Sequence, residues 1–183
     1  MTTLTIYRAD GSGIHKPPTT DIGKIIGELK AIDILMERWP VKPLPKGADQ
    51  ETTLKVYAPE IDKLNKANGF VAIDVLGLAP GAPNKAEMRA KFLAEHTHDD
   101  DEIRYFIEGS GSFYIRKDPF VYQIICTKGD LISVPRGTKH WFDTGSEPSF
   151  RVIRFFTNPK GWEGLFTGDD IATRIPLYEQ KAA

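Results

Sequence analysis

The spacing of hydrophobic residues changes along the chain from a helical to a strand-like period. Over residues 21–36, apolar side chains recur at every third or fourth position, as they do on the buried face of a helix. Thr20 or Asp21 is a suitable capping residue for the first turn, and Trp39-Pro40 would end the helix. We therefore expect a helix here, preceded by a short strand at residues 4–7 that a glycine-rich turn ends.

A second helix-like stretch covers residues 51–68 and is followed by a loop. Its apolar positions have helical spacing, with a break expected at Pro59 and an end near Asn68-Gly69. The apolar run 71–76 is too short for its period to separate a strand from a buried helical turn, so both readings stay open. Residues 79–84 contain two prolines and a glycine, which indicates a loop.

Beyond residue 85 the pattern changes to short runs of β-branched and aromatic residues between turn signals. Turns are expected at residues 109–111, 117–119, 128–130 and 145–148. The strand candidates are residues 103–108, 112–116, 121–127, 131–134, 140–144 and 150–156. Short strands at this spacing are typical of an antiparallel sandwich or barrel, and the C-terminal segment is expected to pack across its outside or its mouth.

Length and composition are those of a single domain that acts on a small molecule. A chain of 183 residues matches one domain, which we expect to have helical elements within about 20–68 and a barrel core over about 70–157. The 24 basic and 25 acidic residues form no basic segment, which argues against a nucleic-acid partner. No apolar run approaches a membrane span and no signal peptide opens the chain, so we expect a cytoplasmic protein with no membrane partner. A monomer is the simplest expectation.

Three of the four histidines occur with a glutamate in two short motifs. The first holds His96, His98 and Glu102, and the second places His140 after a Pro-Arg-Gly-Thr turn. On an extended strand these first three residues share one face, although the acidic insert before Glu102 leaves open whether its side chain reaches the same point. Imidazole and carboxylate together suit a divalent first-row metal and leave coordination positions open for substrate.

There are two alternatives to an open metal site. Isolated histidines are more often surface or satisfied core residues, but their combined spacing with Glu102 argues against this reading here. A closed structural site is mostly built from paired thiolates, whereas the chain has only Cys126. That cysteine lies in an apolar run and is expected to be a small buried hydrophobe, while His15 is distant in sequence from both motifs and is not expected to be a ligand.

The two motifs resemble those of the cupin superfamily. The first consists of His96-Thr97-His98, Glu102 and Gly109, and the second of Gly129, Pro135-Arg136-Gly137 and His140. Ala90 and Thr144 stand where a glycine and an asparagine are common, but neither position is a ligand. The resemblance implies a mainly β fold, a cupin-type antiparallel β-barrel (a double-stranded β-helix, or jelly roll) with additional N-terminal helices.

More narrowly, residues 92–98, 101–106 and 109–111 resemble the acireductone dioxygenase family of methionine salvage, and the likeness extends from residue 4 to residue 162. The resemblance implies oxidation of 1,2-dihydroxy-3-oxo-5-methylthiopentene by O2 with one Fe2+ or Ni2+ per chain. With Fe2+ the products are formate and 4-methylthio-2-oxobutanoate; with Ni2+ they are formate, carbon monoxide and 3-methylthiopropanoate. Another metal-dependent cupin enzyme, an isomerase or a different dioxygenase, and a non-catalytic ligand-binding cupin remain alternatives.

Six further residues are candidates for contact with substrate. Arg104 has the strand parity of Glu102 and could offer a fork of donors to substrate oxygens, unless it is a structural ion-pair partner. The same two readings apply to Arg154, which lies in a very apolar strand, and Asp101 is either the general base or a solvated turn carboxylate. An apolar lining for a methylthio tail, or else plain core packing, is expected of Phe92, Phe142 and Trp162.

Overall fold

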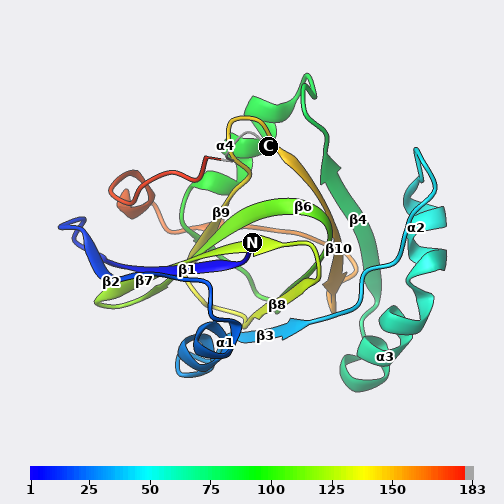
Figure 1. Ribbon diagram of the computed structural model, residues 1–183, viewed down its shortest axis with the longest axis horizontal. Helices are drawn as coiled ribbons and strands as arrows, with labels where there is room; N and C mark the ends of the chain where they lie inside the picture. Colours follow the sequence, from blue (N-terminus) through cyan, green and yellow to red (C-terminus); the bar gives the residue numbers. More distant parts are fainter. Residues whose placement is uncertain (180–183) are drawn as a thin grey trace.

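A long strand, β6 (Glu102–Lys117), runs through both halves of the sheet that forms the core of the protein (Figure 1). The computed structural model describes residues 1–179. The first part of β6 pairs with β8 (Asp130–Val134) and β10 (Ser149–Phe156), and its last part pairs with β7 (Phe120–Thr127) and β9 (His140–Asp143). Each of these pairings is antiparallel, as expected.

Edge strands extend each half. In the first half, β3 (Leu35–Arg38) lies beside β8 and β4 (Ala72–Leu78) lies beside β10. In the second half the added strands are β1 (Thr3–Arg8) and β2 (Ile14–Thr19) beyond β7, and β5 (His96–Thr97) and β11 (Leu165–Phe166) beyond β9. Among residues 1–179, the hydrogen-bonded order runs from β11 to β2 without closing, so the barrel is open. Side chains from both halves meet in one core.

Two helices cover the outer face of the first half. They are α2 (Gln50–Val56) and α3 (Ala58–Asn68), which lie beside β4 in Figure 1. Tyr57 and Ile61 pack there against outward residues of β6 such as Ile103 and Tyr105. The predicted helical stretch is confirmed, except that the break falls at Tyr57, and Pro59 stands in the first turn of α3, where a missing N–H costs nothing. The strand reading of residues 71–76 is the correct one.

The first predicted helix is correct only up to residue 30. It forms α1 (Ile22–Lys30), with the Asp21 side chain accepting from the main-chain N–H of Lys24 as its cap. Asp33 then adopts a positive φ of 65°, which turns the chain away from the helix axis. The next apolar residues belong to β3, where Met36 is buried and Leu35 is exposed. The apolar residues of β3 therefore match the helical spacing of α1 only by coincidence.

The turn predicted at residues 109–111 is wrong, because β6 passes through it without interruption. Gly109 has a φ of 64°, and a Cβ at this position would lie 1.7 Å from the carbonyl oxygen of Ser149. The register between β6 and β10 shifts by one residue nearby, between Arg151 and Val152. The glycine thus marks a bulge inside a strand, where two backbones approach closely, and not a reversal of the chain.

Two elements have no clear signal in the sequence. The helix α4 (Lys85–Leu93) lies in a segment that we expected to begin the strand-rich part, and Phe92 is its one fully buried residue. The strand β2 is exposed along most of its length and contains Pro17 and Pro18, so it shows no alternation of buried and exposed positions. Both elements are set by their neighbours more than by their own patterns.

The C-terminal segment packs across the outside of the second half, as expected. The short helix η1 (Ile171–Thr173) places Ile171 against Tyr114, Val121 and Trp141.

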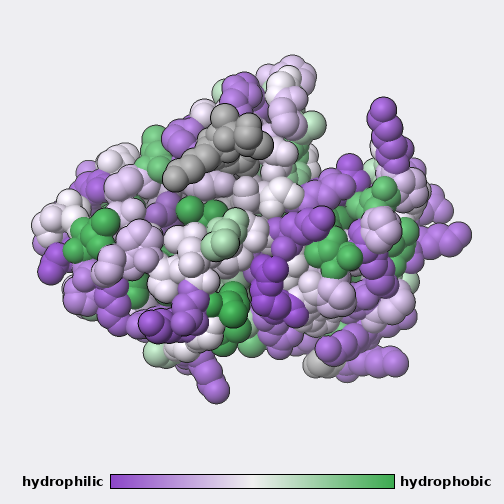
Figure 2. Space-filling model, in the orientation of Figure 1, coloured by the Kyte–Doolittle hydropathy of each residue, from purple (hydrophilic) through white to green (hydrophobic). Residues whose placement is uncertain are grey.

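On the face shown in Figure 2, hydrophobic residues form separate small patches among polar ones. A search of residues 1–179 finds no helix with the length and apolarity that a membrane crossing requires. The monomeric state and the cytoplasmic location stay predictions.

Candidate metal centre

The four predicted ligands lie together at one end of the core. His96 is in β5, His140 faces it in the paired strand β9, His98 follows β5, and Glu102 is the first residue of β6. One nitrogen or oxygen atom from each side chain falls in a group whose members lie within 4.8 Å of one another. All four side chains are buried, with exposures between 0% and 7%. Strands that are far apart in sequence thus deliver four ligand atoms to one point.

Each histidine is oriented through its Nδ1 atom by a main-chain carbonyl. His96 Nδ1 lies 2.7 Å from the oxygen of Ala94, His98 Nδ1 lies 2.6 Å from that of Glu163, and His140 Nδ1 lies 2.8 Å from that of Thr138. A carbonyl accepts only from a protonated nitrogen, so the Nε2 atom of each ring keeps a free lone pair. This is the arrangement in which histidine binds a metal.

The electrostatics of the site favour a neutral His96 beside an ionised Glu102. Burial, followed by the nearby His140, lowers the pKa of His96 to about 4. Burial works against ionisation of Glu102, but the charge of Arg104 and contacts with His140 and His98 hold its pKa well below the ordinary value. Burial also lowers the pKa of His98, yet its contact with Glu102 outweighs this and raises it overall. The carboxylate therefore carries the negative charge of the site.

The ligand atoms have no hydrogen-bond partners among residues 1–179. The three Nε2 atoms and both carboxylate oxygens of Glu102 are buried and make no hydrogen bond with the described residues. His98 Nε2 and His140 Nε2 lie 2.6 and 3.5 Å from Glu102 Oε2, without the angles of a hydrogen bond. Buried polar atoms normally have partners, and a divalent cation would satisfy all of these atoms at once. The residues present therefore fit a bound metal ion.

Arg104 lies next to these ligands and is fully buried. Its Nε atom is 2.5 Å from Glu102 Oε1, while its two terminal nitrogens have no hydrogen-bond partner among the described residues. Three aromatic rings surround the guanidinium, with centroids 4.4 Å (Phe142), 4.9 Å (Phe113) and 5.5 Å (Phe92) from its central carbon. Neither ligand motif indicates Phe113, because this residue lies on a later part of β6. Burial lowers the pKa of Arg104 to about 10, so it stays charged at neutral pH.

The other two charged candidates have protein partners. Arg154 forms two hydrogen bonds with Asp74, of 2.8 and 2.6 Å, which is the structural ion pair left open by the sequence. Asp101 lines a cavity beside the metal ligands, and its carboxylate accepts from the main-chain N–H of Arg136 at 2.8 Å. Asp101 is therefore near enough to the site to remain a candidate base, whereas Arg154 is engaged elsewhere.

Two of the three aromatic candidates lie away from the cavity beside the ligands. The cavity beside His98 and Glu102 is lined by Trp162, Phe156 and Leu165, together with the acidic turn at residues 99–101. Phe92 and Phe142 are fully buried in the core and do not line this cavity. Their rings instead hold the guanidinium of Arg104, a contact that strand parity alone could not separate from pocket lining. Trp162 does line this cavity, with its ring 5.4 Å from that of His98, and its contact with a substrate stays a prediction.

The remaining histidine and the cysteine are outside the site. His15 stacks on Phe120 with ring centroids 4.1 Å apart, far along the chain from the ligand motifs. Cys126 is fully buried, and burial raises the pKa of its thiol well above the ordinary value. The sequence-based expectations that neither residue is a ligand or a reactive group agree with these positions.

Asp100 ties the acidic turn to the loop that carries Trp162, and its replacement by asparagine is expected to destabilise the protein. Its carboxylate accepts from the main-chain N–H groups of Thr157 and Asn158, at 2.7 and 3.0 Å. Partial burial raises its pKa, but the bond from the Thr157 hydroxyl, together with these two main-chain bonds, outweighs burial and lowers the pKa overall. We expect Asp100→Asn to lower the free energy of unfolding by about 1–2 kcal/mol at pH 7.

Because the folded-state pKa of Asp100 is depressed, its stabilising effect is present above about pH 4 and is lost as the pH falls through the folded-state value. Urea unfolding at pH 7 and pH 3 measures the difference, which should shrink at the lower pH. Asp99→Asn, at the exposed neighbouring position, is the matched control and should change stability by less than about 0.5 kcal/mol. A pH-independent loss in Asp100→Asn would contradict the assignment.

Comparison with known proteins gives a consistent result. The family model described as the ARD/ARD' family matches residues 3–164. Acireductone dioxygenase of Parvibaculum lavamentivorans is 50% identical over 182 residues, covering 99% of both chains, and that of Frankia alni is 51% identical over 188 residues, covering 100% of this chain and 91% of the other. A solved acireductone dioxygenase from Bacillus anthracis, with a cadmium ion in its active centre, superposes with a TM-score of 0.79 at 28% identity over 91% of this chain and 98% of that one.

Proposed function

The chain belongs to the ARD/ARD' family, and from that premise we propose that it is a metal-dependent acireductone dioxygenase. Its substrate would be 1,2-dihydroxy-3-oxo-5-methylthiopentene, which it oxidises with O2 in methionine salvage. One observation carries the proposal: four buried ligand atoms that make no hydrogen bond with residues 1–179 stand beside an arginine whose terminal nitrogens also lack hydrogen-bond partners there. The mainly β, jelly-roll architecture expected from the cupin motifs agrees with this family.

His96, His98, Glu102 and His140 would hold the metal ion in this protein. A divalent ion bound there would supply the positive charge that stabilises an enediolate and holds it for reaction with O2. The protein's own contribution begins with Glu102, whose negative charge neutralises part of the charge that the ion and Arg104 bring into a buried site. The carbonyl-oriented histidine rings are already aimed at this point, so binding does not require them to be reoriented.

Arg104 is the residue that we assign to the substrate oxygens. Its Nε side faces Glu102, and the two terminal nitrogens are left to donate to a ligand. The rings of Phe142 and Phe113 fix the plane of the guanidinium, so its donors point in a set direction. A planar, fixed fork of donors suits two adjacent oxygens better than a flexible ammonium does.

Two more residues are proposed to complete the substrate site. Asp101 is the candidate for accepting a substrate proton, because its carboxylate lines the cavity beside the ligands. Trp162 is the candidate for contact with the methylthio tail, since its ring lies against His98 and its buried Nε1–H has no partner among the described residues. Sulfur–aromatic contacts contribute about 0.3–1.5 kcal/mol each, which would favour a tail placed against this ring.

The metal decides between the two product routes. Three imidazoles and a carboxylate bind both Fe2+ and Ni2+, and affinity rises only gradually along the first-row series, so availability would set the occupancy. We propose that the Fe2+ form yields formate and 4-methylthio-2-oxobutanoate. The Ni2+ form would yield formate, carbon monoxide and 3-methylthiopropanoate.

Reconstitution tests the proposal. The purified protein, stripped of metal with a chelator, is loaded separately with Fe2+ and Ni2+ and supplied with acireductone and O2. We expect O2 consumption and formate from both forms, carbon monoxide from the Ni2+ form alone, and neither activity above background from the stripped protein. Metal binding without consumption of O2 in either form would contradict the proposal and favour a different cupin activity.

A further inference from the structure

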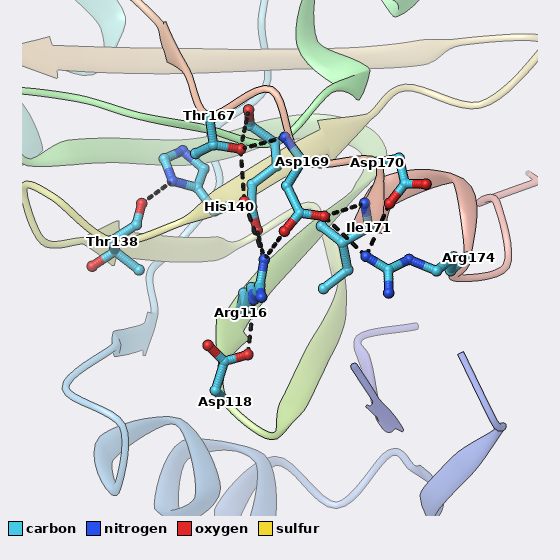
Figure 3. A network of polar contacts seen from close by, with 10 residues as sticks. Arg116, Asp118, Thr138, His140, Thr167, Asp169, Asp170, Ile171 and Arg174 are labelled. Atoms are coloured by element: carbon cyan, nitrogen blue, oxygen red, sulfur yellow. Dashed lines mark hydrogen bonds and ion pairs between the residues drawn. The ribbon is translucent and has the colours of Figure 1, made fainter. Parts of the chain in front are cut away.

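Arg116 lies at the opposite end of β6 from Glu102 and contacts three carboxylates (Figure 3). Its Nη1 atom is 2.8 Å from Asp169 Oδ2 and 3.3 Å from Glu95 Oε2, and its Nε atom is 2.8 Å from Asp118 Oδ1. The hydroxyl of Thr167 donates to Glu95 Oε1 at 2.8 Å. The side chain of Glu95 is fully buried, so this carboxylate depends on Arg116 for its counter-charge. We call Arg116, Glu95, Thr167 and Asp169 the Arg116 cluster.

The cluster adjoins the carbonyls that orient two of the metal-binding histidines. Glu95 follows Ala94, whose oxygen accepts from His96. The main-chain N–H of Arg116 donates to the carbonyl oxygen of Lys139 at 2.9 Å. Lys139 is the residue that follows Thr138. Figure 3 shows the bond from His140 to Thr138 beside Arg116. Arg116 thus contacts the residue directly before each of these histidines. Its side chain pairs with Glu95, before His96, and its main-chain N–H bonds to Lys139, before His140.

The cluster also fixes the segment that orients the third histidine. Glu163, whose carbonyl accepts from His98, lies two residues before β11. Just after β11, the main-chain N–H of Thr167 donates to the Glu95 carbonyl at 3.1 Å. The Thr167 hydroxyl contacts the same carbonyl at 3.4 Å and the Glu95 carboxylate at 2.8 Å. Asp169 then pairs with Arg116. The segment is therefore fastened immediately downstream of the residue that His98 uses.

We propose that Arg116 is a positioning residue for the metal site. It touches none of the four ligands, yet the neighbours of all three orienting carbonyls are attached to it or to its cluster. Without it, the buried carboxylate of Glu95 would lack a counter-charge, and the segment from Glu163 to Asp169 would have to shift to expose that carboxylate to water. The carbonyl bonds that aim the His96 and His98 imidazoles would then be lost, and replacement of such orienting partners lowers metal affinity about 10–100-fold.

The test measures nickel affinity, which is separate from turnover. We expect Arg116→Gln to raise the Kd for Ni2+, measured by competition with a chelator at pH 7.5, about 10–100-fold. Hydrogen exchange should speed up at the amide of Thr167, which reports the bond to Glu95. Arg116→Lys should recover only part of the affinity, because an ammonium cannot reach several carboxylates with the fixed geometry of a guanidinium.

Arg174→Gln is the matched control, since Arg174 also contacts Asp169, at 2.9 Å, but lies on the outer side of the cluster. Its Kd should stay within about twofold of that of the wild type, the change expected for a surface ion pair. If Arg116→Gln does not fold, Thr167→Val removes the bonds that the Thr167 hydroxyl makes to Glu95 and should raise the Kd about fivefold.

Nickel affinity of Arg116→Gln equal to that of the wild type would overturn the inference. So would an equal loss in Arg174→Gln, because the effect would then be a general one of surface charge. The inference rests on the metal site of the proposed function, and the wild type separates the two: failure of the wild type to bind Ni2+ contradicts the metal site itself, whereas normal wild-type binding with no effect of Arg116→Gln contradicts only the role of Arg116.

Discussion

Glu102→Gln is expected to abolish metal binding and turnover and to destabilise the metal-free protein as well. The amide keeps the size of the side chain but removes the one negative charge among the ligands. Arg104 would then be a fully buried cation 2.5 Å from a neutral group. Breaking a buried ion pair by removal of one partner costs about 3–5 kcal/mol, a loss that urea unfolding in the presence of a chelator would measure.

Loss of a ligand should leave less than about 1% of the wild-type rate of O2 consumption, since activation of the substrate depends on the bound ion. Glu108→Gln is the matched control, because Glu108 lies on the same strand but is exposed and pairs with Arg151 at 3.3 Å. It should change stability by no more than about 0.5 kcal/mol and leave turnover unaltered. Full metal content and normal turnover in Glu102→Gln would show that the carboxylate is not a ligand.

Arg104→Lys is expected to lower kcat/KM for acireductone about 10²–10³-fold while the metal content stays near that of the wild type. The ammonium preserves a positive charge beside Glu102, so the ligand set keeps its ionisation. What it loses is the pair of free terminal nitrogens and the planar stacking against Phe142 and Phe113. Steady-state O2 consumption together with metal analysis separates these two effects.

Arg151→Lys serves as the control for this substitution. Arg151 lies on the neighbouring strand and pairs with Glu108 outside the core, so its replacement should leave kcat/KM within about twofold of the wild-type value. Unchanged turnover in Arg104→Lys would remove Arg104 from the substrate site. A loss of metal in parallel with turnover would instead assign it to support of Glu102.

The metal ligands could be predicted from the sequence because their signal is local and chemical. Three histidines and one glutamate are rare residue types for a buried site, and their spacing puts two of them on one strand face. The alternation in β6 was equally informative: Glu102 and Arg104 face inward together, while Ile103 and Tyr105 face the helices. The two-residue alternation of the strand and the types of the residues are thus enough to predict which of these side chains meet in the site.

What the sequence could not supply depends on contacts between distant segments. The continuity of β6 through Gly109 follows from the close approach of Ser149, forty residues later in the chain. The pairing of Arg154 with Asp74, and the packing of Phe92 and Phe142 on Arg104, depend on which strands become neighbours. A single sequence shows that these residues are charged or apolar, but not which partner each one finds.

The three main-chain oxygens that receive the histidine Nδ1–H groups have an evolutionary consequence. A carbonyl is present whatever side chain its residue carries, so Ala94, Thr138 and Glu163 can be exchanged for most other amino acids without loss of the acceptor. Related chains are therefore free to vary at these positions while the ligands stay fixed. A pattern search tuned to residue identity would recover the histidines and miss what points them at the metal.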